Sequence, residues 1–281
     1  MTEPVSDRRV TQTRAGEFEE FARAPHLALG EQVLSLGGYV DHGPHSVQRR
    51  ELPLVGIPVI FTFGSPFRVS DAVNPDAPGL ELPHFLAGLH DTYSTTESTG
   101  ASWLMQLNLT PLGAIRTFGM PLQSLSNRIV AIEDVLRGDG RQLITNLEQS
   151  VTWTERFDLI EGLLLRRLSD APEIDEAIRR SWDQLYCGRG TIPIGILADE
   201  TGWSRRHFAS RFRNQIGLSP KLVARQLRFT SAARLLLRTN HSLSDIANRL
   251  DYSDQAHFTR DFREFSGESP AQFRIAQRAN R

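Results

Sequence analysis

Cysteine is nearly absent from this chain of 281 residues, because Cys187 is the only one. A single thiol cannot close an internal disulfide or build a thiolate metal cluster, so both are excluded. No run of eighteen apolar residues occurs, and no segment is expected to span a membrane. Met1–Arg14 also lacks the apolar core of a secretory signal. We therefore expect a flexible tail over residues 1–24 and a cytoplasmic protein.

Lysine is equally scarce, since Lys221 is the only one and arginine supplies the remaining positive charge. The net charge of −1 conceals an uneven distribution along the chain. Residues 174–281 contain 18 Lys and Arg against 11 Asp and Glu, whereas residues 1–173 contain 14 against 22. A basic half suits a polyanion such as DNA, because neutralising phosphates releases counterions. The acidic half is not expected to bind DNA.

One sequence pattern occurs twice in the basic half, about fifty residues apart. The first copy consists of Leu197-Ala198, Gly202-Trp203-Ser204, Phe208, Phe212, Gly217 and Ser219-Pro220. The second copy consists of Ile246-Ala247, Asp251-Tyr252-Ser253, Phe258, Phe262, Gly267 and Ser269-Pro270. The spacings agree except for one extra residue between the serine and the first phenylalanine of the second copy. Each copy predicts a short helix, a tight turn and a second helix capped by serine, which is a helix-turn-helix unit.

The second helix of each unit should bury its phenylalanines and present its other face to DNA. On the first recognition helix, residues 205–215, the outward residues are Arg205, Arg206, Ala209, Ser210 and Arg213. On the second, the candidate contacts are Gln255, Ala256, His257, Thr259, Arg260 and Arg263. The expected base contacts are Arg206 to guanine, Gln255 to adenine and Arg260 to guanine or phosphate. The expected phosphate contacts are Arg205, Arg213 and Arg263.

Other helices are expected around these units. Residues 173–186 predict a first helix, and Thr191 is expected to cap a second one that turns Ile196, Leu197 and Ala198 inward. Residues 221–238 predict a long helix that joins the two units and fixes their separation. The second unit is expected to begin at Ser242.

In the N-terminal half, the pattern of apolar residues is typical of β-strands. Residues 59–63 follow a proline and end at a Gly-Ser-Pro turn, which predicts a strand. Alternate residues from Trp103 to Leu109 are apolar, which predicts a half-buried strand. Short strands at this spacing are typical of a small antiparallel barrel or sandwich.

A helical period follows the strands. Thr110 is expected to cap a helix that has Pro111 at its first position and ends near Gly119. Residues 152–155 form a capping box before another helix, which Asp170-Ala171-Pro172 ends. We place the domain boundary there, so that residues 25–171, β-rich to about 110 and helical after, form a sensor or dimerisation domain. Residues 172–281 form the DNA-binding domain.

The expected fold class is thus α+β. It combines an N-terminal antiparallel, cupin-like β barrel with flanking helices and a C-terminal all-α domain of two helix-turn-helix units joined by a long helix.

The basic half resembles the AraC/XylS family of bacterial transcription regulators. The resemblance covers residues 174–276 and rests above all on Ile246-Ala247, Tyr252-Ser253-Asp254-Gln255 and the segment from Phe258 to Arg274. It implies that both recognition helices enter successive major-groove segments on one face of the DNA. Asp251 departs from the family pattern, which has glycine at this turn, and an aspartate tolerates the left-handed backbone with slight strain.

The acidic half is similar to the sensor-like region of some AraC-type regulators. The segments concerned are Phe63-Gly64-Ser65-Pro66-Phe67-Arg68, Thr96-Glu97-Ser98-Thr99-Gly100 and Leu109-Thr110-Pro111-Leu112-Gly113-Ala114. The resemblance implies an input domain and names no ligand.

The sequence therefore predicts a DNA-binding transcription regulator, an activator or a repressor, and not an enzyme. Its expected partners are double-stranded DNA, a small organic effector, RNA polymerase and a second copy of the chain. The candidate effector contacts are Phe63, His90, Glu97 and Trp103. No cofactor or metal is expected, because His42, His45, His84 and His90 lack a diagnostic ligand spacing. Two alternatives remain open: a DNA-tethered metalloenzyme of cupin type, and a regulator whose N-terminal domain only binds protein.

Overall fold

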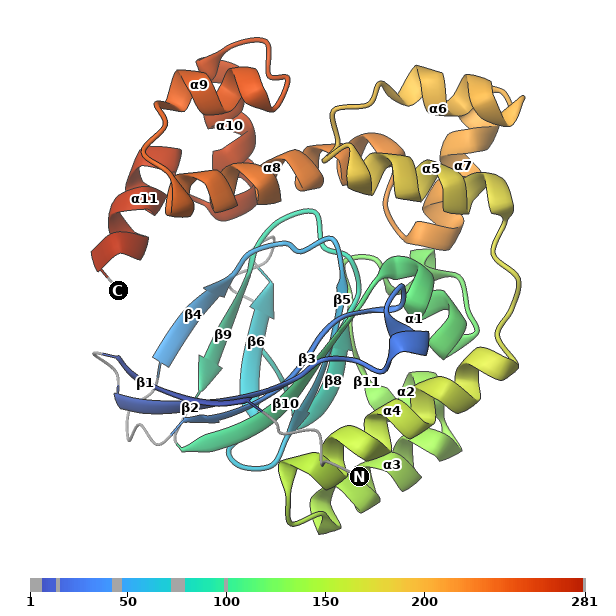
Figure 1. Cartoon of the computed structure of the whole chain (residues 1–281), viewed down its shortest axis with the longest axis vertical. Coiled ribbons are helices and arrows are strands. Elements are labelled where there is room, and N and C mark those ends of the chain that lie inside the picture. The colour runs from blue at the N-terminus through green and yellow to red at the C-terminus, as the bar shows by residue number, and fades with distance from the viewer. Residues whose placement is uncertain (1–6, 14–15, 42–46, 72–78, 99–100, 280–281) are drawn as a thin grey trace.

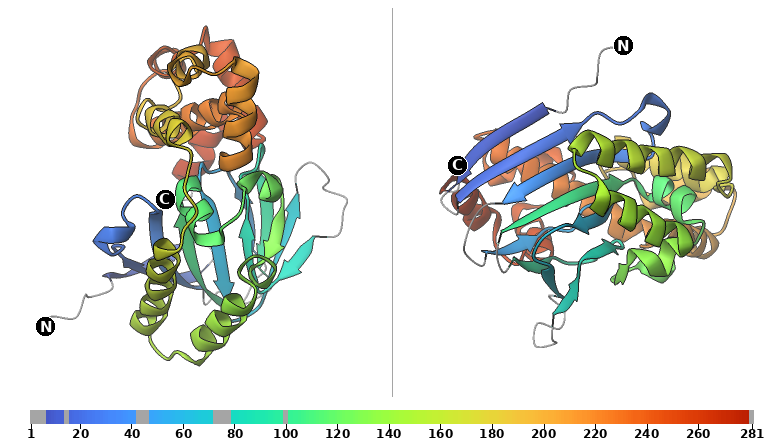
Figure 2. Two further views of the ribbon diagram at one scale, coloured as in Figure 1. Left: turned by 90° about the vertical axis from the view of Figure 1, so that its right-hand side faces the viewer. Right: turned by 90° about the horizontal axis from the view of Figure 1, so that it is seen from below.

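The computed structural model describes residues 7–13, 16–41, 47–71, 79–98 and 101–279. A β domain with short helices forms the N-terminal half, and a helical domain stands on one end of it (Figures 1 and 2). Within the described residues, no helix is long and apolar enough to cross a membrane.

Two antiparallel sheets build the N-terminal domain. The larger sheet contains, in spatial order, β1 (Asp7–Thr13), β2 (Gly16–Arg23), β3 (Val33–Asp41), β10 (Ser102–Leu109), β5 (Ile57–Thr62), β8 (His84–Ala87) and β11 (Ile129–Ala131). The smaller sheet contains β4 (Val47–Glu51), β9 (Ser94–Ser98), β6 (Phe67–Asp71) and β7 (Leu80–Leu82). The central strand β10 pairs with both β3 and β5, so that Leu107 lies opposite Leu36 on one side and Val59 on the other.

Helices cover the outer face of the larger sheet. They are η1 (Leu27–Leu29), α1 (Pro111–Phe118), η2 (Leu122–Leu125), α2 (Ile132–Leu136), α3 (Gly138–Gln149) and α4 (Trp153–Ser169). Met105, Leu107 and Leu109 on β10 are buried in one hydrophobic cluster with residues of α1, α3 and α4. Strand alternation therefore turns the odd-numbered residues of β10 toward the helices and the even-numbered ones toward the other sheet.

The caps expected between strands and helices are confirmed. Thr110 caps α1 through the amide of Gly113, and Gly119 ends the helix with a φ of 69°. Thr152 and Glu155 form both hydrogen bonds of a capping box at α4. The helix ends at Ser169, next to the predicted break.

The helical domain contains two helix-turn-helix units on one long helix. Its helices are α5 (Glu176–Cys187), α6 (Ile194–Thr201), α7 (Arg205–Ile216), α8 (Pro220–Arg238), α9 (Leu243–Arg249), α10 (Gln255–Ser266) and α11 (Pro270–Ala279). The long helix α8 lies across the top of the β domain and joins the units (Figure 1). The predicted α+β fold class, with antiparallel sheets followed by this all-helical domain, is confirmed.

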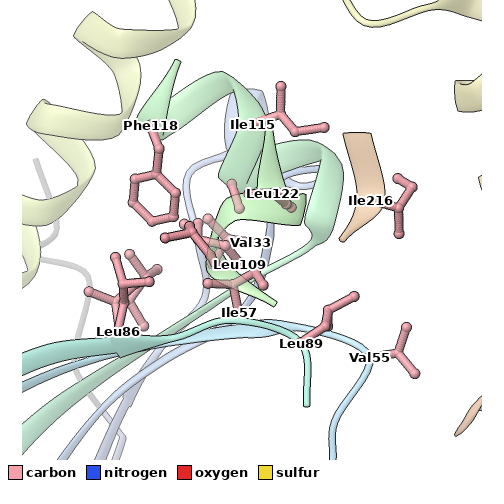
Figure 3. Close-up of a cluster of buried hydrophobic side chains, with 14 of the residues drawn as sticks. Val33, Val55, Ile57, Leu86, Leu89, Leu109, Ile115, Phe118, Leu122 and Ile216 are labelled. Atoms are coloured by element: carbon pink, nitrogen blue, oxygen red, sulfur yellow. The ribbon is translucent and has the colours of Figure 1, made fainter. Parts of the chain in front are cut away.

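The two units have different cores. The first unit shares one continuous hydrophobic cluster with the N-terminal domain, and Ile216 of α7 belongs to the same cluster as Leu122 and Leu89 (Figure 3). The second unit has its own aromatic cluster, built by Tyr252, Phe229, Phe258, Phe262, Phe265 and Phe273. The first unit is thus fused to the N-terminal domain, whereas the second has a separate core.

The expected tail over residues 1–24 is wrong for residues 7–13 and 16–23, which form the paired strands β1 and β2. Residues 18–23 of β2 also pair along β3. Phe21 stacks on Trp153 with ring centroids 5.0 Å apart. Its partner in the ladder is Gly38, where a side chain would collide with the same indole ring. The Arg23 guanidinium also lies 2.5 Å from Asp158 on α4. These contacts are distant in sequence, and the polar composition of the segment concealed them.

Two details of the first unit also differ from expectation. The helix α6 begins after Pro193 and not at Thr191, whose hydroxyl instead donates to the carbonyl of Gly188 at 2.8 Å. Ile196, expected to face inward, is 51% exposed. Leu197 and Ala198 are fully buried as predicted.

Candidate nucleic-acid interface

The first helix-turn-helix unit has the local structure that its sequence predicts. Gly202 ends α6 in the left-handed region at φ 69°, where a glycine carries no steric cost. Ser204 then caps α7, and its hydroxyl accepts the amide of His207 at 3.2 Å. Phe208 and Phe212 are fully buried on the inner face of this recognition helix.

The second unit resolves the one irregularity of the repeat. Asp251 takes the turn position of Gly202 and adopts φ 57°. The helix cap is Asp254 and not Ser253, because the Asp254 carboxylate accepts the amide of His257 at 2.6 Å. This hydrogen bond lowers the pKa of Asp254. The cap therefore lies four residues before Phe258, as Ser204 lies before Phe208, and the extra residue is absorbed in the turn.

The predicted DNA-contact residues lie mostly on open surface. Those exposed on the two recognition helices are Arg205, Arg206, Ser210, Arg213, Gln255, Ala256, Arg260 and Arg263. Ala209, His257 and Thr259 are half-buried. The imidazole of His257 contacts the Ser253 hydroxyl at 3.1 Å, so its side chain is tied to the turn.

Some arginines in this domain form ion pairs with nearby carboxylates, whereas, within the described residues, the outward arginines of the recognition helices do not. Arg211 lies 3.0 Å from Asp175, and Arg225 lies 2.5 Å from Asp261. Across the described part of the chain, no comparable ion pair holds Arg206, Arg213 or Arg260. Their positive charge therefore remains available to an anionic partner.

Both recognition helices contact the N-terminal domain through their C-terminal ends. At the end of α7, the Ser126 hydroxyl donates to the carbonyl of Gly217 at 2.5 Å. At the end of α10, the Arg50 guanidinium donates to the carbonyl of Ser266 at 2.8 Å. The N-terminal turns of both helices, which reach bases first in helix-turn-helix complexes, stay exposed.

A cavity of about 330 Å³ lies between the two sheets of the N-terminal domain. Its apolar lining includes Ile60, Phe67, Val69, Phe85 and Leu104, and its polar lining includes Tyr39, Arg49, Thr96, Gln106 and His90. The Nδ1 atom of His90 lies 2.7 Å from the carbonyl oxygen of Gly88. Because a carbonyl only accepts, Nδ1 is the donor of this hydrogen bond, which leaves Nε2 for a ligand.

Of the four predicted effector contacts, only His90 lines this cavity. Phe63 and Trp103 do not line it, because alternation turns these odd-numbered positions away from the cavity. Phe63 meets the Arg156 guanidinium 4.6 Å from its ring centroid, and Trp103 is 43% exposed. Glu97 also points away, since its neighbours Thr96 and Ser98 line the cavity while Glu97 pairs with Arg68 at 3.9 Å. Alternation was visible in the sequence, but it does not show which face of a strand packs under helices and which face lines a cavity.

No group of three His, Cys, Asp or Glu residues is placed to hold a metal ion anywhere in the described ranges. His42 and His45 lie outside the described residues.

The comparisons with known proteins agree with this architecture. A family model described as a helix-turn-helix domain matches residues 197–276, which cover both units. The arabinose operon regulatory protein of Escherichia coli (strain K12) is 27% identical over 125 residues, 42% of this chain and 43% of the relative. The transcriptional activator RhaS of Enterobacter sp. (strain 638) is 28% identical over 153 residues, 50% of this chain and 55% of the relative. The chain thus spans about half the length of these curated relatives.

Solved structures show partial similarity. The unsaturated fatty acid bound ToxT from Vibrio cholerae strain SCE256 has a TM-score of 0.48 at 9% identity, covering 90% of this chain and 97% of that one. The DNA-binding domain of AdpA in complex with a target DNA has a TM-score of 0.36 at 29% identity, covering 38% and 97%.

Fold, capped repeat and family model together define the C-terminal half as a helix-turn-helix domain. The regulators that this domain matches bear out the predicted resemblance of the C-terminal half to AraC-type regulators.

Proposed function

We propose that the protein is a sequence-specific DNA-binding transcription regulator, with no enzymatic activity of its own. One observation carries the proposal: both recognition helices rest on the N-terminal domain by their C-terminal ends and leave their N-terminal turns exposed. One helix, α8, links the two units. The units are then expected to read major-groove segments about one turn, ~34 Å, apart on one face of the DNA.

The full-length protein and selected operator DNA test this proposal. Arg206→Ala and Arg260→Ala should each cost about 1–3 kcal/mol of binding free energy and relax specificity at separate base positions. Arg141→Ala, an exposed arginine on α3, is the matched control for loss of one charge and should leave binding unchanged. Footprints without two protected patches about ten base pairs apart would contradict the geometry.

We further propose that the cavity binds a small organic effector. Its volume of about 330 Å³ and its mostly apolar lining with a few polar groups are typical of small-molecule sites. His90 would form a hydrogen bond with the ligand through Nε2. The test is thermal stabilisation of the full chain by a library of metabolites, compared with Ile60→Phe, which narrows the cavity. A shift that persists in Ile60→Phe would place the ligand elsewhere.

The remaining predicted partners follow from the family resemblance. We propose an activator that contacts RNA polymerase and forms a homodimer. Sedimentation of the full chain checks the dimer. Tight dimerisation without any ligand-induced stabilisation would favour the alternative in which the N-terminal domain only binds protein.

A further inference from the structure

The two helix-turn-helix units are attached to the N-terminal domain in different ways. The first unit is held by the continuous hydrophobic cluster that contains Ile216, Leu122 and Leu125. The second unit is held by a peripheral set of mostly polar contacts. A small change in the N-terminal domain would therefore act on the second unit more readily than on the first.

The contacts to the second unit come from two short segments, residues 49–52 and 90–94, which we call the docking edge. Thr92 donates its hydroxyl proton to the carbonyl of Glu264 at 3.2 Å. The ring of Tyr93 packs on Gly267, where an added Cβ would lie 2.7 Å from the ring. The Arg50 guanidinium lies over the same ring, 4.7 Å from its centroid, and also 3.8 Å from Glu268. The docking edge thus contacts the end of α10 and the turn between α10 and α11 through three side chains.

A further contact reaches the linking helix. Gln226 on α8 is fully buried, and its amide donates to the backbone carbonyl of His90. The backbone that carries the cavity-lining imidazole of His90 is therefore bonded directly to the helix that joins the units.

The same segments also form the wall of the cavity. Arg49, Glu51 and Leu52 line it from one segment, and His90, Thr92 and Ser94 line it from the other. Leu52 additionally packs against the aromatic cluster of the second unit. One side chain therefore touches both the cavity and the core beneath the second recognition helix.

We propose that the docking edge sets the position of the second recognition helix and that occupancy of the cavity changes this position through Leu52 and Arg50. The first unit keeps its place because the shared core holds it. A ligand thereby adjusts the affinity for one half-site and leaves the other unchanged. This inference rests on the proposed function and adds to it the unit that is regulated.

The experiment uses the full-length protein and footprints that resolve the two half-sites. Leu52→Ala and Arg50→Ala should weaken protection of the second half-site about threefold or more and leave the first unchanged. Leu27→Ala and Arg141→Ala are controls that remove the same kinds of side chain, because both residues are exposed and neither lines the cavity or packs on the second unit. Both controls should preserve protection of both half-sites.

Because the ligand is unidentified, a larger side chain inside the cavity is used to mimic its occupancy. Ile60→Phe fills part of the cavity and should change protection of the second half-site in the wild-type background. The change should disappear when Leu52→Ala is also present, because coupled residues give non-additive effects. Additive effects, equal loss at both half-sites, or no loss in Leu52→Ala and Arg50→Ala would each overturn the inference.

Hydrogen exchange supplies a readout that needs no DNA. Amides of residues 262–268 should exchange faster in Leu52→Ala, whereas those of residues 205–216 should not change. Exchange that is unchanged at 262–268 would overturn the inference. If the wild-type protein binds no DNA while this exchange pattern appears, the proposed function fails and the coupling stands.

Discussion

Arg225 on α8 donates two hydrogen bonds to the same oxygen of Asp261 on α10, from Nε at 2.8 Å and from Nη2 at 2.5 Å. The Asp261 side chain is only 5% exposed, and Glu264 adds a second carboxylate on the solvent side of Arg225. Burial alone would lower the pKa of Arg225, but these two carboxylates raise it above its ordinary value. The pair holds the second recognition helix against the linking helix.

Asp261→Ala should therefore lower the free energy of unfolding by about 2 kcal/mol, because a hydrogen-bonded charge pair is lost in a buried position. Glu264→Ala removes the exposed carboxylate of the same network and should cost less than about 1 kcal/mol. Urea denaturation followed by tryptophan fluorescence measures both values. An equal loss of unfolding free energy in the two variants would show that the buried carboxylate of Asp261 contributes no more than the exposed one of Glu264.

Arg205, Arg213 and Arg263 are proposed to contact phosphate. Replacing each with alanine should weaken binding to every DNA sequence alike and reduce the slope of log affinity against log salt by about 1. Affinity measured at several salt concentrations, on operator and on unrelated DNA, checks this. If Arg213→Ala altered base preference without changing the salt slope, its role would be base reading.

The turns of the two units should respond differently to substitution. Gly202→Ala places a Cβ at φ 69° and should lower the free energy of unfolding by about 1 kcal/mol. Asp251→Gly removes the steric strain of a side chain at φ 57° but increases the conformational entropy of the unfolded chain. The two effects oppose each other, so the free energy of unfolding should change by no more than about 0.5 kcal/mol. Thermal denaturation measures both. A large loss in Asp251→Gly would mean that the Asp251 side chain contributes more than its backbone conformation.

His84 should make stability depend on pH. Its side chain is 7% exposed, and Nε2 lies 3.5 Å from Glu148. Burial lowers the pKa of His84, and the carboxylates of Glu148 and Glu133 offset only part of that effect. The folded protein therefore keeps the ring neutral, while the unfolded chain takes up a proton below about pH 6.5. The contribution of neutral His84 to the free energy of unfolding is therefore fully present above that pH. It is lost as the pH falls toward the lower pKa that His84 has in the folded protein.

His84→Phe tests this dependence, because Phe61 and Phe63 already surround the ring. The variant should lose the part of the decline in unfolding free energy between pH 7 and pH 5 that His84 causes. Glu148→Gln should steepen the decline, because one of the groups that raises the pKa is removed. An unchanged pH profile in His84→Phe would assign the decline to other groups.

Local features were predictable from the sequence. The caps at Thr110, Thr152 and Ser204 and the turn at Gly202 depend on interactions within four residues, and all of them occur as expected. The duplicated pattern also identified the two recognition helices, because the spacing of buried phenylalanines fixes which side faces outward.

Features that depend on distant contacts were not predictable. The strand β2 forms because Phe21 meets Trp153, more than a hundred residues later in the chain. The side of a strand that lines the cavity is decided by where helices pack, so the sequence could not show that Phe63 and Trp103 lie on the side away from it. The cap at Asp254 was missed because Ser253 and Asp254 are both good caps, and only the geometry of the turn selects between them.

The hydrophobic cluster that joins Ile216 to Leu122 and Leu89 has a consequence for how this architecture can be recombined. The chain passes from one domain to the other near residue 170, but the first helix-turn-helix unit completes its core with side chains from before that point. The first unit and the β domain should melt in one cooperative transition, since neither closes its apolar surface alone. A hybrid that grafts this DNA-binding half onto a foreign sensor must therefore carry over the helices at 111–125 as well, or rebuild the face that they cover.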